Sequence, residues 1–223
     1  MKDKILFVVT SHGELGDSGR KTGYFLSEVT HPWSVLGEKY EIDVVSPEGG
    51  RPPVDGFDLK DPINRKFWDD RDWQEKMSTT LTPDQVDPNQ YRAVFFAGGH
   101  GAMFDLPENV ALKKIVATIY ENGGYVAAVC HGPAGLINVT LSDGTPLVKD
   151  KKFDCFTNEE EKENGTVPFM PYLLQSALEE KGGNFDGAVP WSDHVVQDGR
   201  LITGQNPQSA LSLGKVVLQA LGN

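Results

Sequence analysis

The chain is poor in cysteine and in basic residues. Its 223 residues contain two cysteines, which form neither a disulfide framework nor the paired spacing of a zinc site. Lys and Arg number 21 against 32 Asp and Glu, and the formal net charge is −11. Binding to a nucleic-acid backbone needs clustered cations, so we expect no nucleic-acid partner. The unpaired cysteines favour a reducing compartment, and we expect a cytoplasmic protein.

Long apolar runs are missing as well. The first run, residues 5–9, is shorter than the apolar core of a signal peptide and has no small-residue cleavage site after it. No stretch reaches the roughly 20 apolar residues that span a bilayer, so no membrane partner is expected. The sequence also has no internal repeat and no low-complexity tract. We therefore expect one domain over residues 1–223.

What the sequence does contain is an alternation of short apolar runs with helix-like segments. This alternation is typical of an α/β fold with a mainly parallel sheet covered on both faces. Thr22 is the expected N-cap of the first helix, and Pro32 is expected to end or kink it. A helical insertion is expected around residues 57–85. The expected strands are 5–9, 41–46, 92–97, 125–129, 153–156, 189–196 and 200–203, and the expected helices are 23–30, 64–77, 108–121, 171–181 and one that starts at 206–207.

Cys130 is the predicted nucleophile. It ends the apolar run 125–129 and is followed at once by His-Gly-Pro, so the chain must turn sharply from a buried strand into a helix. Such a turn resembles a nucleophile elbow, which presents its side chain at the carboxyl end of the sheet. A helix N-terminus would lower the thiol pKa below its ordinary value of about 8.5. Cys155 shares a strand face with Phe153 and has no such turn, so we expect it to be a packed structural residue.

A glycine pair follows the neighbouring strand 92–97. Gly98 and Gly99 can turn backbone N–H groups toward a developing oxyanion, and we predict Gly99 and His131 as its donors. His100 is expected to line the same pocket. His12, His31 and His194 are isolated in the sequence and are expected to be structural. They form no recognisable ligand spacing, so we expect neither a metal nor another cofactor.

The segment Ala127-Ala-Val-Cys-His-Gly-Pro133 resembles the ThiJ/PfpI superfamily, which is class I glutamine-amidotransferase-like. The resemblance covers nearly the whole chain. It implies a flavodoxin-like three-layer α/β/α sandwich with a nucleophile elbow, and commonly a homodimer. Further segments resemble the heat-shock-type branch of glutathione-independent glyoxalases, also called glyoxalase III: residues 21–32, 97–101, 122–126, 156–158, 190–191 and 198–207.

The resemblance also implies two acidic site residues. In that branch a glutamate on the first helix contacts the cysteine, and Glu28 occupies the matching place. Burial beside the thiol would raise the pKa of the Glu28 carboxyl group and leave an acid able to exchange a proton with substrate. An acidic partner of the histidine follows a Phe-Thr-Asp-like motif, which has Asn158 as its third residue here. The spacing gives Glu161, but Glu159 and Glu160 are its neighbours and compete for the role.

The implied function is a glutathione-independent glyoxalase, a lyase of the lactate dehydratase type that detoxifies methylglyoxal. The Cys130 thiolate would form a hemithioacetal with a 2-oxoaldehyde, and Glu28 or His131 would move the carbon-bound proton to yield a 2-hydroxy acid. The resemblance leaves a stress-related holdase chaperone, a protein deglycase and a cysteine peptidase as alternatives. Glutamine amidotransfer is disfavoured, because the late histidine His194 lacks a glutamate two residues on.

Overall fold

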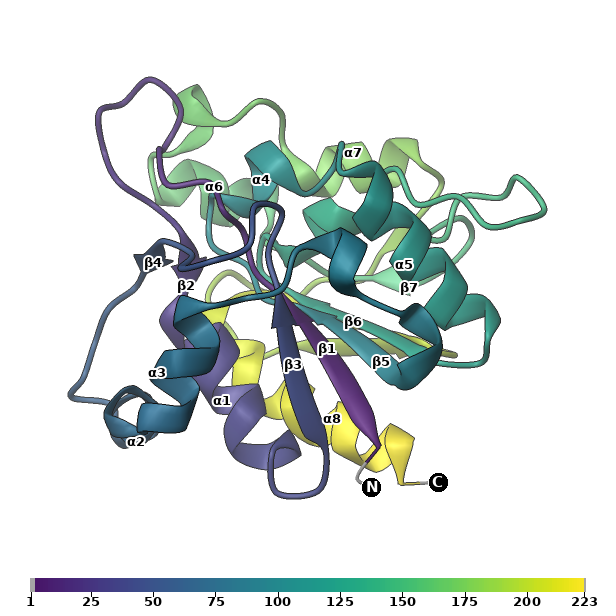
Figure 1. Ribbon diagram of the computed structural model, residues 1–223. Coiled ribbons are helices and arrows are strands. Elements are labelled where there is room, and N and C mark those ends of the chain that lie inside the picture. The colour runs from purple at the N-terminus through teal and green to yellow at the C-terminus, as the bar shows by residue number, and fades with distance from the viewer. Residues whose placement is uncertain (1–2, 223) are drawn as a thin grey trace.

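The computed structural model describes residues 3–222, and its centre is a six-stranded sheet. The strand order is β3-β1-β5-β6-β10-β9, and all neighbours pair parallel except β10 with β9. This confirms the mainly parallel sheet (Figure 1). The six strands are β1 (Lys4–Val8), β3 (Glu41–Val45), β5 (Tyr91–Phe96), β6 (Tyr125–Val129), β9 (Val195–Asp198) and β10 (Leu201–Gly204). Two short parallel pairs lie apart from them, β2 (Tyr24–Phe25) with β4 (Val54–Asp55) and β7 (Lys152–Phe153) with β8 (Asn184–Phe185).

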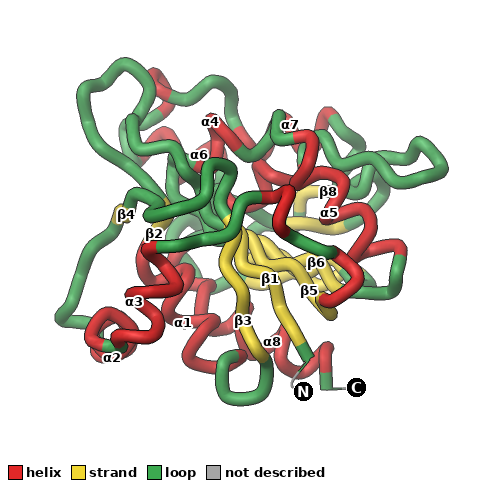
Figure 2. The backbone as a smooth tube through the Cα atoms, in the orientation of Figure 1, coloured by secondary structure: helices red, strands yellow, loops and turns green. Residues whose placement is uncertain are grey.

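Helices cover both faces of the sheet, as the three-layer sandwich requires. α1 (Leu26–Leu36) and α8 (Ala210–Leu221) pack on one face, while α5 (Val110–Glu121) and α7 (Leu174–Glu180) cover the other (Figure 2). The remaining helices are α2 (Pro62–Asp69), α3 (Arg71–Ser78), α4 (Ala102–Asp105) and α6 (Asn158–Glu163), and the short 3₁₀ turns are η1 (Pro83–Gln85), η2 (Pro88–Gln90), η3 (Gly132–Leu136), η4 (Val167–Phe169) and η5 (Pro207–Ser209). No helix among residues 3–222 is long and apolar enough to cross a membrane.

The continuous apolar character of the inner strands follows from this layering. Successive side chains of a strand point to opposite faces, and here both faces are dry. In β1, Ile5 and Phe7 join the core under α1 and α8, whereas Leu6 and Val8 join the core under α5. Packing on both faces fixes the positions of β1, β5 and β6, whose carboxyl ends lie side by side at one edge of the sheet.

The first helix differs from the prediction at both ends. Thr22 is not its N-cap: the helix begins at Leu26 after β2, and the Thr22 hydroxyl instead donates a hydrogen bond to Asp55 at 2.9 Å. Pro32 does not end the helix, which continues to Leu36. Proline has no backbone N–H, so α1 lacks one helical hydrogen bond at Pro32. At the same point α1 packs closely on α8, because a Cβ on Gly214 of α8 would lie 2.9 Å from the Pro32 Cα atom.

The helix expected over residues 64–77 is two helices. Asp61 caps α2 and Asp70 caps α3, each carboxylate accepting from two backbone N–H groups of the following turn. The break at Asp70 turns the chain, so that Phe67 packs against Trp73 with ring centroids 5.3 Å apart. Periodicity alone missed the break, because a mid-pattern aspartate reads as an exposed helix residue.

Two strands near the C-terminus are shorter than predicted. β7 ends at Phe153, and β9 begins only at Val195, so residues 186–194 form a loop without strand or helix. The hairpin between β9 and β10 is confirmed, with Gly199 at φ 58° in its turn. Side-chain hydrogen bonds replace strand pairing in the loop, which the apolar pattern does not reveal.

Candidate active site

Cys130 lies at the turn that follows β6. Its φ angle is 59°, a left-handed conformation that is rare for a residue with a side chain and costs about 1–3 kcal/mol. The turn is fixed on both sides, because Cys130 N–H donates to the Gly204 carbonyl at 2.8 Å and its carbonyl accepts from Phe156 at 2.9 Å. The predicted elbow is therefore present. It leads into the 3₁₀ turn η3 rather than directly into an α-helix.

Two glycines allow the backbone to close around the sulfur. A Cβ on Gly132 would lie 2.4 Å from the Phe96 carbonyl oxygen, so only glycine fits where η3 crosses the end of β5. Gly99 has a φ angle of 96°, and a Cβ on it would lie 2.1 Å from the Gly23 carbonyl oxygen. The backbone N–H groups of Gly99 and His131 both donate toward the Cys130 sulfur. The two predicted oxyanion donors thus converge on the candidate nucleophile.

His131 connects the sulfur to a carboxylate. Its Nδ1 lies 3.4 Å from Cys130 Sγ, and its Nε2 lies 2.7 Å from Glu161 Oε2. Of the three consecutive glutamates, the geometry brings Glu161 to the histidine, whereas Glu159 is exposed. Burial lowers the pKa of His131, and the nearby His100 lowers it further. The ring is therefore neutral, with Nε2–H donating to Glu161 and Nδ1 free to accept the thiol proton.

Glu161 also contacts His100. Its Oε1 lies 3.1 Å from His100 Nε2 and accepts from the Thr166 hydroxyl. Burial alone would raise the pKa of Glu161, but the hydrogen bonds to His100 and His131 outweigh it and hold the pKa below its usual range. The group stays a carboxylate and fixes the orientation of both imidazoles.

Glu28 approaches Cys130 from α1 and is fully buried. Its Oε2 accepts from Gly98 N–H at 2.7 Å, and the carboxyl group interacts with the Cys130 thiol. Among the described residues Oε1 has no conventional hydrogen-bond partner. Burial raises the pKa of Glu28 to about 8, against the opposing effects of Cys130 and Gly98. At neutral pH the site therefore contains a carboxylic acid that holds its proton.

The thiol differs from the prediction in its protonation state. Burial raises the pKa of Cys130, and an ionised Glu28 would raise it further, while the N–H groups of Gly99 and His131 act in the opposite direction. The expected lowering by a helix N-terminus is wrong, because desolvation dominates and the following turn is short. The resting group is a thiol that needs a base, and His131 Nδ1 is at hand.

The sulfur opens into a cavity of about 310 Å³. Residues from distant parts of the chain form its walls, and Gly99, His100 and His131 line it together with Cys130. This volume lies at the lower limit of small-molecule sites, which measure about 300–1,000 Å³. The other lining residues are Leu15, Arg20, Lys21, Phe25, Asp55, Phe156, Asn164, Trp191, Pro207 and Gln208.

Three donor groups of the site lie close enough to hold a metal ion. The ligand atoms of His100, His131 and Glu161 are all within 4.8 Å of one another. Reasoning from histidine spacing did not find this group, since its members come from three separate segments. The same atoms already satisfy one another through hydrogen bonds.

The remaining predicted structural residues lie elsewhere. His31 pairs with Asp61 at 2.9 Å, and His194 pairs with Asp154 at 3.0 Å. His12 stacks on Phe104. Cys155 is buried in the core under α5. Within residues 3–222, none of these four residues lines the cavity at Cys130.

Sequence reasoning missed the role of Glu160. This side chain is completely buried beside the site and caps α6 together with Thr157. The signal was available, because a threonine followed three residues later by a glutamate is a capping box. Its further partners on a distant loop carry no sequence signal.

Comparisons with known proteins find similar sequences and structures over almost the whole chain. The model of the DJ-1/PfpI family matches residues 21–220. The chain is 35% identical to Glyoxalase 3 of Candida albicans, over 97% of this chain and 98% of that protein. The crystal structure of glyoxalase III from Candida albicans superposes with a TM-score of 0.90 at 33% identity, covering 97% and 96% of the two chains. The Rapid Encystment Protein 24 kDa of Francisella tularensis superposes with a TM-score of 0.95 at 39% identity, covering 100% of both.

Proposed function

The chain belongs to the DJ-1/PfpI family, and we propose from this premise that it is a glutathione-independent glyoxalase that converts methylglyoxal and related 2-oxoaldehydes to 2-hydroxy acids. One observation carries the proposal: the buried Glu28 carboxyl group and the buried His131 imidazole flank the Cys130 thiol, and burial raises the pKa of the first and lowers the pKa of the second. An acid and a base on either side of a nucleophile are what an internal proton transfer requires. The names of the relatives favour this activity over the holdase, deglycase and peptidase alternatives.

The first step is addition to the aldehyde. As Cys130 sulfur forms a bond to the aldehyde carbon, its proton passes to His131 Nδ1 and the carbonyl electron pair moves to oxygen. The N–H groups of Gly99 and His131 stabilise the developing alkoxide. Return of the proton from His131 gives a neutral hemithioacetal and a neutral imidazole, held in place by Glu161.

The second step moves hydrogen between two carbons. His131 removes the proton of the carbon bound to sulfur, while Glu28 donates its proton to the neighbouring ketone oxygen, and an enediol results. His131 then protonates the neighbouring carbon, and the hydroxyl on the sulfur-bound carbon returns its proton to Glu28. The product is a thioester of lactate. The oxidation of one carbon balances the reduction of the other, so neither glutathione nor a nicotinamide takes part.

The last step is hydrolysis. Water activated by His131 attacks the thioester carbonyl, the carbon–sulfur bond breaks, and the thiol regains a proton. The same N–H groups stabilise this second oxyanion. Cys130 is thereby returned to its resting state, and lactate leaves.

Product analysis tests the proposal. Purified protein is incubated with methylglyoxal without glutathione, and lactate is measured for wild type, Cys130→Ala and Glu28→Gln. We expect lactate from the wild type and from the matched control Cys155→Ala, and none from Cys130→Ala or Glu28→Gln. Wild-type protein that makes no lactate, or a Cys130→Ala variant as active as wild type, would overturn the proposal. The homodimer and the cytoplasmic location stay predictions.

A further inference from the structure

Trp191 forms the outer part of an aromatic wall of the cavity. Its indole packs edge-on against Phe156 with centroids 5.5 Å apart, and Phe156 in turn lies 4.4 Å from the ring of His131. The backbone of Trp191 has a φ angle of 63°, which residues with a side chain rarely adopt. Such strain persists only where the surrounding contacts enforce it. The position of this ring is therefore held by its neighbours rather than by local preference.

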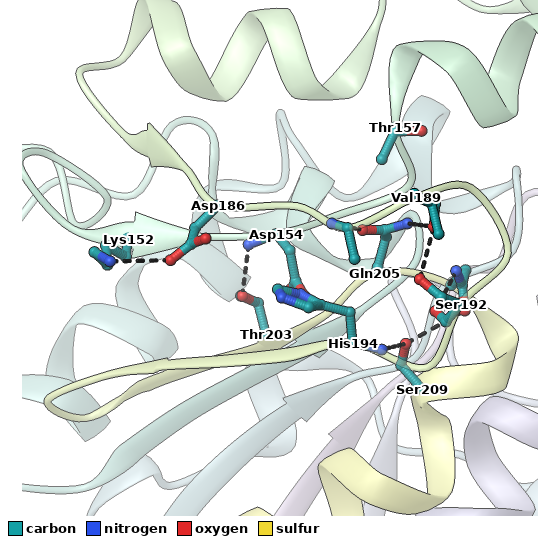
Figure 3. A network of polar contacts seen from close by, with 12 residues as sticks. Lys152, Asp154, Thr157, Asp186, Val189, Ser192, His194, Thr203, Gln205 and Ser209 are labelled. Carbon is teal, nitrogen blue, oxygen red and sulfur yellow. Dashed lines mark hydrogen bonds and ion pairs between the residues drawn. The ribbon is translucent and has the colours of Figure 1, made fainter.

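The loop 186–194 that carries Trp191 is tied to the start of the last helical segment. Gln205 accepts from Ala188 N–H at 2.8 Å and donates to the Val189 carbonyl at 3.3 Å, and Asn206 donates to the Ser192 carbonyl at 2.9 Å. Figure 3 shows Gln205 reaching the loop at Val189, and His194 anchored on Ser209 at its end. Hydrogen bonds therefore fix both ends of the loop.

Glu160 holds the middle of the loop. Its Oε1 accepts from Trp191 N–H at 2.7 Å, from Asn206 at 2.8 Å and from Gln205 at 3.1 Å. Its Oε2 accepts from Thr157 N–H at 2.9 Å. All four partners are donors, so a buried carboxylate fits this site and an amide does not. A second acid, Glu163, accepts from the indole N–H at 2.6 Å.

Two adjacent glutamates of α6 therefore serve the two sides of one cavity. Glu161 orients the base His131, and Glu160 orients the loop whose Trp191 closes the cavity wall. Because both glutamates belong to the same turn of α6, this one helix sets the position of Trp191 relative to His131.

We propose that Trp191 determines the specificity of the site by limiting the size of the substituent on the 2-oxoaldehyde, and that Glu160 is the positioning residue that holds it there. The substrate class rests on the proposed function. The cavity is small, and the large Trp191 side chain lines it while remaining partly exposed. Removing the indole enlarges the space beyond the reacting carbonyl without touching Cys130 or His131.

Kinetics with two substrates tests the proposal. The ratio of kcat/KM for phenylglyoxal to that for methylglyoxal is measured for wild type, Trp191→Ala, Trp191→Phe, Glu160→Gln and Glu159→Gln. We expect the ratio to rise about tenfold in Trp191→Ala, within the range that one pocket contact commands. The change should lie in KM for phenylglyoxal.

The other variants separate positioning from folding. Glu160→Gln should shift the ratio in the same direction. Its NH2 group must face either Thr157 N–H or the three donors at the Oε1 position, and either contact between donors loosens the loop that carries Trp191. Glu159→Gln, a substitution at the exposed neighbour, should leave it within twofold of wild type. Trp191→Phe keeps an aromatic wall and should also remain near wild type. An unchanged ratio in a folded Trp191→Ala protein refutes the proposal whatever Glu160→Gln does.

A second measurement does not depend on glyoxalase activity. Alkylation of Cys130 by iodoacetamide and by a bulky pyrenyl iodoacetamide is followed by peptide mass, which also separates Cys130 from Cys155. The bulky-to-small rate ratio should rise in Trp191→Ala. If the wild type converted neither methylglyoxal nor phenylglyoxal but the alkylation ratio rose in Trp191→Ala, the proposed function would be refuted, whereas the role of Trp191 in limiting the size of the cavity would be supported. If the wild type converts methylglyoxal normally and neither the kcat/KM ratio nor the alkylation ratio changes in Trp191→Ala, only the proposed role of Trp191 is refuted.

Discussion

Replacing Glu28 by glutamine should change how stability depends on pH. Burial raises the pKa of Glu28 from 4.5 to about 8, so the folded protein keeps a proton that the unfolded chain has lost. The contribution of this group is fully present below pH 4.5 and is lost as the pH rises through 8. Between pH 5 and pH 8 the wild type should lose about 3–4 kcal/mol of unfolding free energy from Glu28. Glutamine does not titrate, so the variant should lack this loss.

Urea unfolding at pH 5, 6, 7 and 8 measures the effect. Asp154, whose pKa burial raises to about 7, contributes a pH dependence in the same direction. It is present in both proteins and cancels in the difference between them. The exposed-site variant Glu159→Gln serves as control and should follow the wild-type curve. Parallel curves for wild type and Glu28→Gln would refute the conclusion that Glu28 is a buried neutral acid.

Three further substitutions test the rest of the site. Glu161→Gln should lower kcat/KM for methylglyoxal by about 10²–10⁴ with the fold intact, because His131 loses the carboxylate that fixes its tautomer; steady-state kinetics at pH 7 measures it. In urea unfolding, Cys130→Gly should be about 1–2 kcal/mol more stable than Cys130→Ala, since glycine adopts a φ angle of 59° without strain; equal stabilities would contradict a strained elbow. Gly132→Ala should destabilise by about 1–3 kcal/mol, because its Cβ meets the Phe96 carbonyl; a neutral effect in thermal melts would count against this close approach.

Much of the fold could be predicted from local pattern. The strand over residues 125–129 agrees with the prediction, and the other inner strands are shifted by about one residue. These runs are apolar because both faces are buried, and that pattern is visible in one sequence. Predictions failed where side-chain contacts decide whether a helix or strand forms. Asp70 caps α3 and splits the predicted helix, α1 continues through Pro32 where it packs on Gly214, and residues 189–194 form a loop held by hydrogen bonds.

The sequence by itself determined the elbow and its neighbours. Cys130 at the end of an apolar strand, with His131 and Gly132 after it, leaves the chain one sharp turn to make, and Gly99 follows the adjacent parallel strand. What only the tertiary structure decided was the chemistry of the acids. Glu28 holds a proton because the packing of α1 against the sheet buries it, and a one-residue difference on α6 turns Glu161 toward His131 and Glu160 toward Trp191. Burial and partners of this kind come from segments far apart in the chain, so no local pattern encodes them.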